Sequence, residues 1–405
     1  MKRCLFLLLV CSTFFLSGCW SNDELSDLAL VSALGVDKTD DGQYVGTVQV
    51  INPGNVAGEG KQGTGGSESA PVTSYSEIGT SLIEVNRRLS TKVSRQLYYA
   101  HTNLFIIGEK LAREEGVMKI FDALERDPEF RTTTRIIIAQ GVNAADIIKT
   151  LTPLDKIPSN KVIKTMELTE RFWGEHLNVE TRDVLKKLTM PGQEPVITCF
   201  TMSGDPEEGE KLESIQETVP NARFQATGIA IFKDGKMIDI INGDLSKGTV
   251  WVLDKIKETA VAVDWEEEKD SIVYRSLRQN TNVKASVKNK NKPEISVEVA
   301  VEGGIGETSK PVDLSNPHIL IELEDLIEKE IKENIMSSVN KAQELQTDFL
   351  GFGEAVHRAD PQAWKQMKHA WNKEYFPDLE VNITVDAFVR RTGLRNKPFF
   401  SNMEG

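Results

Sequence analysis

Residues 317–345 read PHILIELEDLIEKEIKENIMSSVNKAQEL, and this stretch decides the fold class of the C-terminal half. Its apolar side chains recur at spacings of three and four residues, as they do on one face of a helix. They are Ile319, Leu323, Leu326, Ile327, Ile331, Ile335, Val339 and Ala342. An apolar helix face must be buried against another layer of secondary structure. The stretch therefore predicts a long amphipathic helix that packs on a sheet.

Alternating apolar and polar residues before this helix predict the strands of that sheet. Strand patterns cover residues 258–265, 271–277, 281–287 and 294–302. Strands that follow one another in this way favour an antiparallel meander. Residues 380–390 alternate again after the helix and predict a closing strand. Upstream, Asp234-Gly235 separates two alternating runs and predicts a hairpin.

A strongly acidic segment precedes that hairpin. Its carboxylates are Asp205, Glu207, Glu208, Glu210, Glu213 and Glu217. They lack the Asp-x-Asp-x-Asp-Gly order of a calcium loop, so the pattern favours a solvated connection. We therefore predict an N-terminal domain over residues 19–202, an acidic linker over 203–222 and a C-terminal domain over 223–395.

The N-terminal half alternates strands with helices. Residues 28–37 and 44–51 predict a hairpin, and residues 103–107 and 133–140 predict further strands with a helix between them. Ser76 is expected to cap another helix, which carries apolar positions from 82 to 93 in an imperfect stripe. This order predicts a mixed sheet covered by helices. The whole chain is thus expected to be a multi-domain α+β protein.

The N-terminus has the pattern of an export signal. Lys2 and Arg3 precede an apolar run over residues 5–16, which is too short for a spanning helix of roughly 20 residues. The run ends in Leu-Ser-Gly followed by Cys19, which resembles the bacterial lipobox. We therefore predict that residues 1–18 are removed as a signal peptide. Acylation of Cys19 would then tether the mature protein to membrane lipid.

The composition argues against several other classes of protein. A formal net charge of −13 over 405 residues disfavours binding to nucleic acid. Cys199 is the one cysteine that follows Cys19, so neither a disulfide within the body nor a cysteine-based metal site is predicted. No HExxH or Gly-x-Ser-x-Gly pattern occurs, and no Gly-x-Gly-x-x-Gly follows a strand pattern directly. No catalytic residue, metal or cofactor is therefore predicted. The aromatic residues Trp364, Trp371, Tyr375 and Phe376 could line a ligand pocket, but their helical spacing favours core packing.

Four blocks of sequence resemble the C subunits of spore germinant receptors, the GerAC/GerBC/GerKC lipoprotein family. The first joins Cys19-Trp20 to Ala33-Leu34-Gly35-Val36-Asp37, and the second is residues 227–236, TGIAIFKDGK. The third is residues 346–354, QTDFLGFGE. The fourth joins Phe376-Pro377-Asp378-Leu379 to residues 390–393, RRTG. Each block alone would be a weak match. The four together are specific to this family, because they span nearly the whole chain in the family's order.

The resemblance implies a function that composition alone could not indicate. Such proteins have three mixed α/β domains and no known enzymatic activity, and they lie on the outer face of the spore inner membrane. They assemble with the A and B membrane subunits of the receptor, and nutrients then trigger germination. Two alternatives stay open from the residues alone. A lipid-anchored solute-binding protein would need two similar lobes around a cleft, and a cell-wall enzyme would need a convergent catalytic site.

Overall fold

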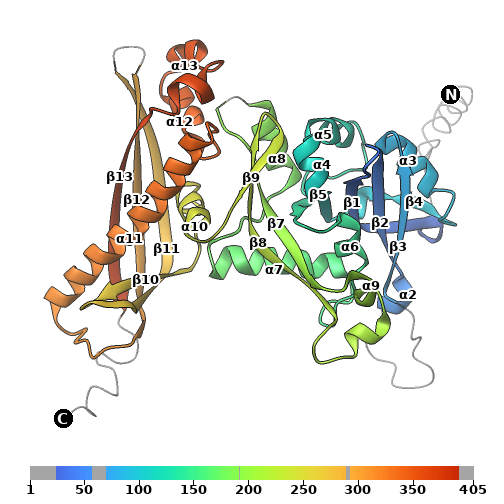
Figure 1. Ribbon diagram of the computed structural model, residues 1–405, viewed down its shortest axis with the longest axis horizontal. Coiled ribbons are helices and arrows are strands. Elements are labelled where there is room, and N and C mark those ends of the chain that lie inside the picture. The colour runs from blue at the N-terminus through green and yellow to red at the C-terminus, as the bar shows by residue number, and fades with distance from the viewer. Residues whose placement is uncertain (1–23, 57–69, 191, 289–291, 392–405) are drawn as a thin grey trace, which may run out of the picture.

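The computed structural model describes residues 24–56, 70–190, 192–288 and 292–391 (Figure 1). Two mixed sheets organise this part of the chain, and helices cover or flank each of them. The chain is therefore an α+β protein, as the sequence predicted.

The first sheet has parallel strands at its centre and antiparallel strands at both edges. Its strand order is β3-β2-β1-β5-β6-β7-β8-β9, with the short β4 paired to β1. The strands are β1 (Leu28–Lys38), β2 (Tyr44–Ile51), β3 (Val72–Gly79), β4 (Gln96–Tyr98), β5 (Leu104–Gly108), β6 (Arg135–Ala139), β7 (Val196–Gly204), β8 (Ala222–Lys233) and β9 (Lys236–Ile241). Both predicted hairpins, β1–β2 and β8–β9, are confirmed as antiparallel pairs.

Helices and helical turns precede, connect and follow these strands, and the sequence predicted those near α3 to α8 and α10. They are η1 (Leu25–Asp27), α2 (Pro53–Val56), α3 (Leu82–Leu89), η2 (Tyr99–His101), α4 (Glu109–Glu114), α5 (Met118–Glu125), α6 (Ala144–Lys149), α7 (Pro158–Phe172), α8 (Thr181–Thr189), α9 (Pro206–Gly209), η3 (Leu212–Ile215) and α10 (Gly243–Val252). The break between α4 and α5 falls at Gly116, whose φ of +88° favours glycine. The turn of the β8–β9 hairpin packs there, because Val117 N donates to the carbonyl of Gly235 at 2.8 Å.

The cap predicted for α3 is wrong. Ser76 lies inside β3 opposite Thr47 of β2, and the Oγ of Ser81 accepts the N–H of Glu84 at the true N-terminus of the helix. The sequence pattern did not predict β3, because serine, threonine and glutamate occupy half of its positions. Strand pairing with β2, rather than local propensity, fixes this segment as a strand.

The acidic segment joins two strands of the same sheet. Residues 203–222 lead from β7 to β8, which pair antiparallel from Val196 with Ile231 to Gly204 with Ala222. Within the segment, the side chain of Asp205 caps α9 through the N–H of Glu207. The division of the chain into domains at this segment stays a prediction.

The second sheet has the predicted antiparallel meander followed by a parallel closing strand. It comprises β10 (Thr259–Trp265), β11 (Glu268–Lys288), β12 (Lys292–Thr308) and β13 (Glu380–Arg391). Two strands predicted separately are both part of β11, whose register against β12 shifts between Ser276 and Arg278. The closing strand β13 pairs parallel with β12. A long crossover is needed for such a pair, and the helices between β12 and β13 supply it.

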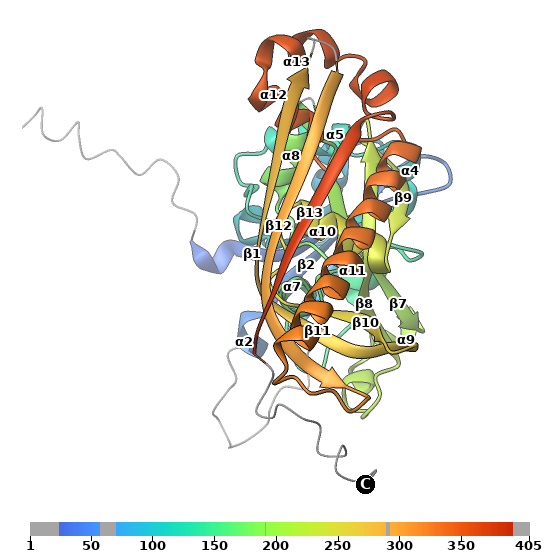
Figure 2. The same cartoon turned by 90° about the vertical axis from the view of Figure 1, so that its left-hand side faces the viewer.

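The crossover contains the long amphipathic helix that was predicted over residues 317–345. The helix α11 (Pro317–Glu344) runs alongside β13 in Figure 2, and α12 (Phe352–Ala359), α13 (Pro361–Met367) and a π-helical turn, η4 (Trp371–Tyr375), follow it. Its buried residues are Leu323, Ile327, Ile331, Asn334, Ile335, Ser338, Val339 and Ala342. The apolar ones belong to one hydrophobic cluster that extends from the first sheet to β13. The helix therefore contributes to a core shared by both halves.

Candidate functional site

Cys19 and the predicted signal peptide over residues 1–18 lie outside the described residues. Among the helices that are described, none combines the length and the apolar character needed to cross a bilayer. The described part of the chain begins four residues before β1, so the predicted attachment point is close in sequence to the central strand of the first sheet.

The other residues singled out from the sequence belong to the core. Cys199 is buried within β7, and burial raises the pKa of its thiol, so this thiol stays protonated. Trp364, Trp371 and Phe376 are also buried, and the two indole rings meet edge to face with centroids 5.2 Å apart. Their burial confirms the core interpretation of the aromatic group. No cluster of metal-ligating side chains occurs among the described residues.

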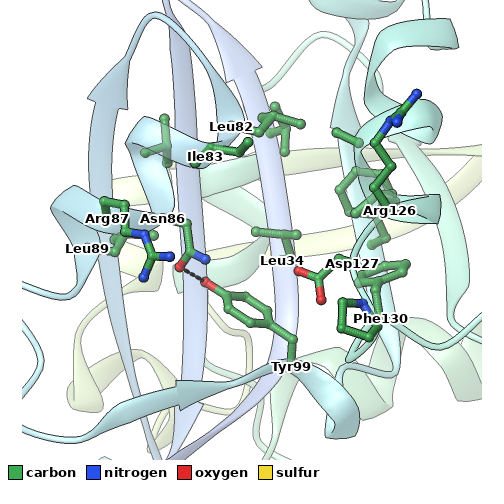
Figure 3. A pocket seen from close by; sticks show the side chains of 17 residues that line it. Leu34, Leu82, Ile83, Asn86, Arg87, Leu89, Tyr99, Arg126, Asp127 and Phe130 are labelled. Atoms are coloured by element: carbon green, nitrogen blue, oxygen red, sulfur yellow. Dashed lines mark hydrogen bonds between the residues drawn. The ribbon is translucent and has the colours of Figure 1, made fainter.

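A cavity that the sequence did not predict opens on the first sheet. It has a volume of about 350 Å³ and lies between α3 and the segment around α5 (Figure 3). Its apolar lining includes Leu34 of β1, Phe105 of β5 and Phe130. Leu34 is only half-buried although β1 is a central strand, and it packs against the hydrophobic clusters on both sides of the cavity. The cavity is thus a gap between two groups of covering helices.

Polar side chains gather at one end of this gap. Tyr99 Oη donates to Oδ1 of Asn86 at 2.8 Å, and Asp127 Oδ1 accepts the N–H of Glu129 at 2.9 Å. Burial, followed by the negative charges of Asp127 and Glu129, raises the pKa of Tyr99. Tyr99 therefore stays a neutral hydroxyl at physiological pH, and its proton remains available for the bond to Asn86.

Two arginines at the cavity differ in their surroundings. Arg126 forms an i,i+4 ion pair with Asp122, at 3.0 Å. The guanidinium of Arg87 has neither a hydrogen bond nor an ion pair within the described residues. A groove of about 840 Å³ continues past Arg87 and Tyr99 toward Arg95. The sequence held one indication of this cavity, namely the imperfect apolar stripe of α3. Asn86 and Arg87 interrupt the stripe, and both line the cavity.

A second polar cluster joins the first sheet to the helices after α11. Its centre is Asp348, which is buried and accepts the N–H groups of Gly351, Phe352 and Gly353 at 2.6–3.1 Å. The indole Nε1 of Trp371 donates to the same carboxylate at 2.8 Å. The helix α12 begins at Phe352, so this carboxylate stabilises a helix N-terminus from inside the core.

Glu194, just before β7, connects this cluster to the first sheet. Its N–H donates to the carbonyl of Asp348 at 2.8 Å, and its Oε1 accepts Nδ2 of Asn372 at 3.4 Å. Burial, together with the negative charges of Asp234 and Asp348, raises the pKa of Glu194 to about 7. Burial also raises the pKa of Asp348 to about 6, against the opposing effect of its hydrogen bonds. The two halves therefore meet at carboxyl groups that titrate near neutral pH.

We expect Glu194→Gln to stabilise the protein at pH 8. The folded-state pKa of about 7 exceeds the ordinary value of 4.5, so the charge on Glu194 opposes folding as pH rises from 4.5 through 7. Removing that charge should raise the free energy of unfolding by up to about 3 kcal/mol at pH 8, and by much less at pH 5. Urea melts at the two pH values measure this difference.

Glu322→Gln is the matched control, because Glu322 is exposed on α11. It should leave the melts unchanged at both pH values. A Glu194→Gln variant that is no more stable than the wild type at pH 8 would contradict this. It would show that hydrogen bonds stabilise the charged Glu194 carboxylate at least as much as burial destabilises it.

Comparison with known protein families gives two matches. Residues 21–202 match the family described as the spore germination protein N-terminal domain. Residues 227–393 match the family described as spore germination B3/GerAC like, C-terminal. The two matched regions cover most of the described fold, including both sheets.

Similar proteins are found along the whole chain. Spore germination protein KC of Bacillus subtilis (strain 168) is 43% identical over 399 residues, covering 98% of each chain. Spore germination protein A3 of the same organism is 24% identical over 405 residues, covering 98% of this chain and 99% of its own. The crystal structure of the GerBC protein matches with a TM-score of 0.55 and 21% identity, over 88% of this chain and 96% of that one. This structural match concerns the fold.

Proposed function

This chain belongs to the GerAC-like spore germination family of germinant-receptor subunits, and we propose that it acts as a lipid-anchored, non-catalytic C subunit in the spore inner membrane. The observation that carries the proposal is the 43% identity to protein KC over 98% of both chains. Similarity of this extent includes both halves of the fold and the connection between them. It therefore favours a shared role for the whole chain rather than for one domain.

Attachment through a lipid on Cys19 is the first part of the proposal. The net charge of −13 disfavours adsorption to anionic lipid, so attachment needs a dedicated anchor. Leu28, the first residue of β1, follows Cys19 by nine positions. A chain of that length spans at most about 30 Å when extended, which would keep the first sheet close to the bilayer.

Assembly with the A and B membrane subunits is the second part. Relatives of this chain are named spore germination proteins A3, B3 and KC. These names support the proposal that such proteins are equivalent subunits of receptors with the same kinds of subunit. The solute-binding alternative requires two similar lobes around a cleft. The two sheets differ, since the first has a parallel centre and the second is a meander with a crossover helix. This difference favours the receptor subunit.

We expect Cys19→Ala to release the protein from the membrane and to impair the response to nutrients. The variant is best expressed in spores that lack the A and B subunits, so that no partner can retain it. The amount of protein in washed membranes, measured by immunoblotting, gives the result, and nearly all of the variant should move to the soluble fraction.

Cys199→Ala is the matched control, because it changes a cysteine buried in β7. This control should stay in the membrane fraction. If Cys19→Ala also remains there without partners, the anchor assignment is wrong. If it is released yet supports a normal nutrient response with its partners present, anchoring is not needed for the receptor role.

A further inference from the structure

The cavity beside α3 is an apolar surface that lacks a cover among the described residues. Leu34 and Phe130 in its lining are only half-buried, and Ile83, which also lines it, is 72% exposed. Its volume of about 350 Å³ exceeds the roughly 150 Å³ that holds a benzene molecule in an apolar protein cavity. The cavity is thus large enough for one aromatic side chain from another segment.

The groove beside this cavity leads to the N-terminal end of the described chain. Groove and cavity share the lining residues Asn86, Arg87, Tyr99, Asp127 and Pro128. Asp27, the last residue before β1, also lines the groove. Trp20 precedes Asp27 by seven positions, so the chain between them spans at most about 25 Å. The segment before Glu24 therefore starts beside a groove that is continuous with the cavity.

Trp20 is the side chain outside the described residues that best matches this location. Within residues 19–23 it is the one large apolar side chain. Residues 57–69 and 289–291 contain no apolar side chain larger than alanine, and residues 392–405 follow β13 in the other sheet. The position of the groove and the size of the cavity therefore both favour Trp20.

The chemistry of the cavity also suits an indole ring. An indole combines an apolar body with a single N–H donor, which usually finds an acceptor when the ring is buried. Asp127 lies between Leu34 and Phe130 in Figure 3, and its carboxylate receives only the backbone N–H of Glu129 among the described contacts. The carboxylate therefore has room for one more donor beside the apolar lining.

We propose that Trp20 occupies the cavity beside α3 and closes it. The indole ring lies on Leu34 and Phe130, and its N–H donates to the carboxylate of Asp127. Docking removes apolar surface of both the ring and the cavity from water, which favours it. Only residues 21–23 separate Trp20 from Glu24, so few residues lose conformational freedom when the ring docks.

Docking of Trp20 adds a direction to the proposed anchoring of the chain. Cys19 is the neighbour of Trp20, so a docked ring holds Cys19 next to α3. The face of the first sheet that carries α3 then meets the bilayer. This consequence rests on the proposed acylation of Cys19, whereas the docking itself does not.

Photo-cross-linking of the full-length protein in its native membrane tests the docking. Ile83 is replaced by the photoreactive residue p-benzoylphenylalanine, and mass spectrometry identifies the product. Irradiation is expected to link position 83 to a peptide that contains Trp20. The same photoreactive residue in place of Ile321, which is exposed on α11, is the matched control and should give no such link. The proposal is overturned if position 83 forms no link, or if it links to a lipid or another protein instead.

Substitutions of Trp20 show whether the indole ring is needed. At equal amounts of protein, Trp20→Ala should lower the yield of the link roughly tenfold or more, because the apolar contact is lost. Trp20→Phe should retain part of the yield, since it keeps an aromatic ring but lacks the N–H donor. A yield that Trp20→Ala leaves unchanged would refute the assignment of this residue.

Filling the cavity tests the other partner. Ala123→Phe should occupy the cavity and lower the yield of the link, while Ala300→Phe, on the exposed face of the second sheet, should leave it unchanged. Thermal melts show whether Ala123→Phe stays folded, and an unchanged yield in the folded variant would refute the cavity as the docking site. If Ala123→Phe unfolds, Trp20→Ala alone decides the outcome. Failure of these tests leaves the membrane-release test of Cys19→Ala unaffected.

Discussion

Asp348→Ala is expected to unfold the junction between the two halves of the protein. The substitution leaves four buried donors without an acceptor, namely three backbone N–H groups and the indole N–H of Trp371. Each buried unsatisfied donor costs about 1–3 kcal/mol, so the four together cost about 4–12 kcal/mol, of which the relief of the buried charge offsets a part. This is a large share of a typical stability of about 5–15 kcal/mol. Thermal and urea melts of the purified chain measure it.

Two further variants test whether the loss of stability comes from the buried Asp348 carboxylate and its four hydrogen bonds. Asp348→Asn should also destabilise, because Oδ1 accepts from Gly351 and Phe352 while Oδ2 accepts from Gly353 and Trp371, and an amide has only one oxygen. Asp360→Ala is the control. Asp360 caps α13 by accepting two backbone N–H groups near the surface, so its loss should cost only about 1 kcal/mol. Equal melting temperatures for Asp348→Ala and Asp360→Ala would contradict the account.

The structure explains why the sequence could identify the block around Asp348 but not its role. Residues 346–354 were singled out through their resemblance to a family, and nothing in their spacing indicated a buried cap. The acceptor is Asp348, one of its donors is Trp371, and the neighbouring Glu194 comes from before β7. Contacts between segments so far apart in sequence depend on tertiary packing, which a local pattern does not specify.

Local patterns did predict the elements with strong periodicity. The helix α11 was predicted within one residue of its end at Glu344, and the β8–β9 hairpin follows from Asp234-Gly235, both of which have positive φ. The parallel pairing of β13 with β12 was not predicted. A strand pattern shows which face is buried but not which neighbour it joins.

The two candidate sites, Cys19 and the cavity beside α3, also differ in how far the sequence could predict them. The prediction for Cys19 rests entirely on residues adjacent in the sequence, and it stays a prediction because the described residues do not include it. The cavity brings Leu34, Arg87, Tyr99 and Asp127 together from separate elements. It is a gap left between packed helices, and a gap has no sequence pattern of its own.

Ile331→Glu is expected to unfold the C-terminal half. Ile331 is 1% exposed on the buried face of α11, within the hydrophobic cluster that both sheets share. Losing a buried isoleucine costs about 2–5 kcal/mol, and a carboxylate without a partner in the same place costs more. The melting temperature should fall steeply, or the variant should fail to fold, as measured by circular dichroism.

Ile321→Glu separates this core role from a role in binding a partner. Ile321 lies on the same helix and is 54% exposed, so the same substitution should leave the melting temperature nearly unchanged. If Ile331→Glu instead melted like the wild type while receptor assembly was lost, the buried face would be a partner interface, and its assignment to the core would be wrong. If Ile321→Glu alone abolished assembly in a stable protein, the exposed face of α11 would be the surface that meets the membrane subunits. The one helix that decides the fold can thus be tested on both faces with a single kind of substitution.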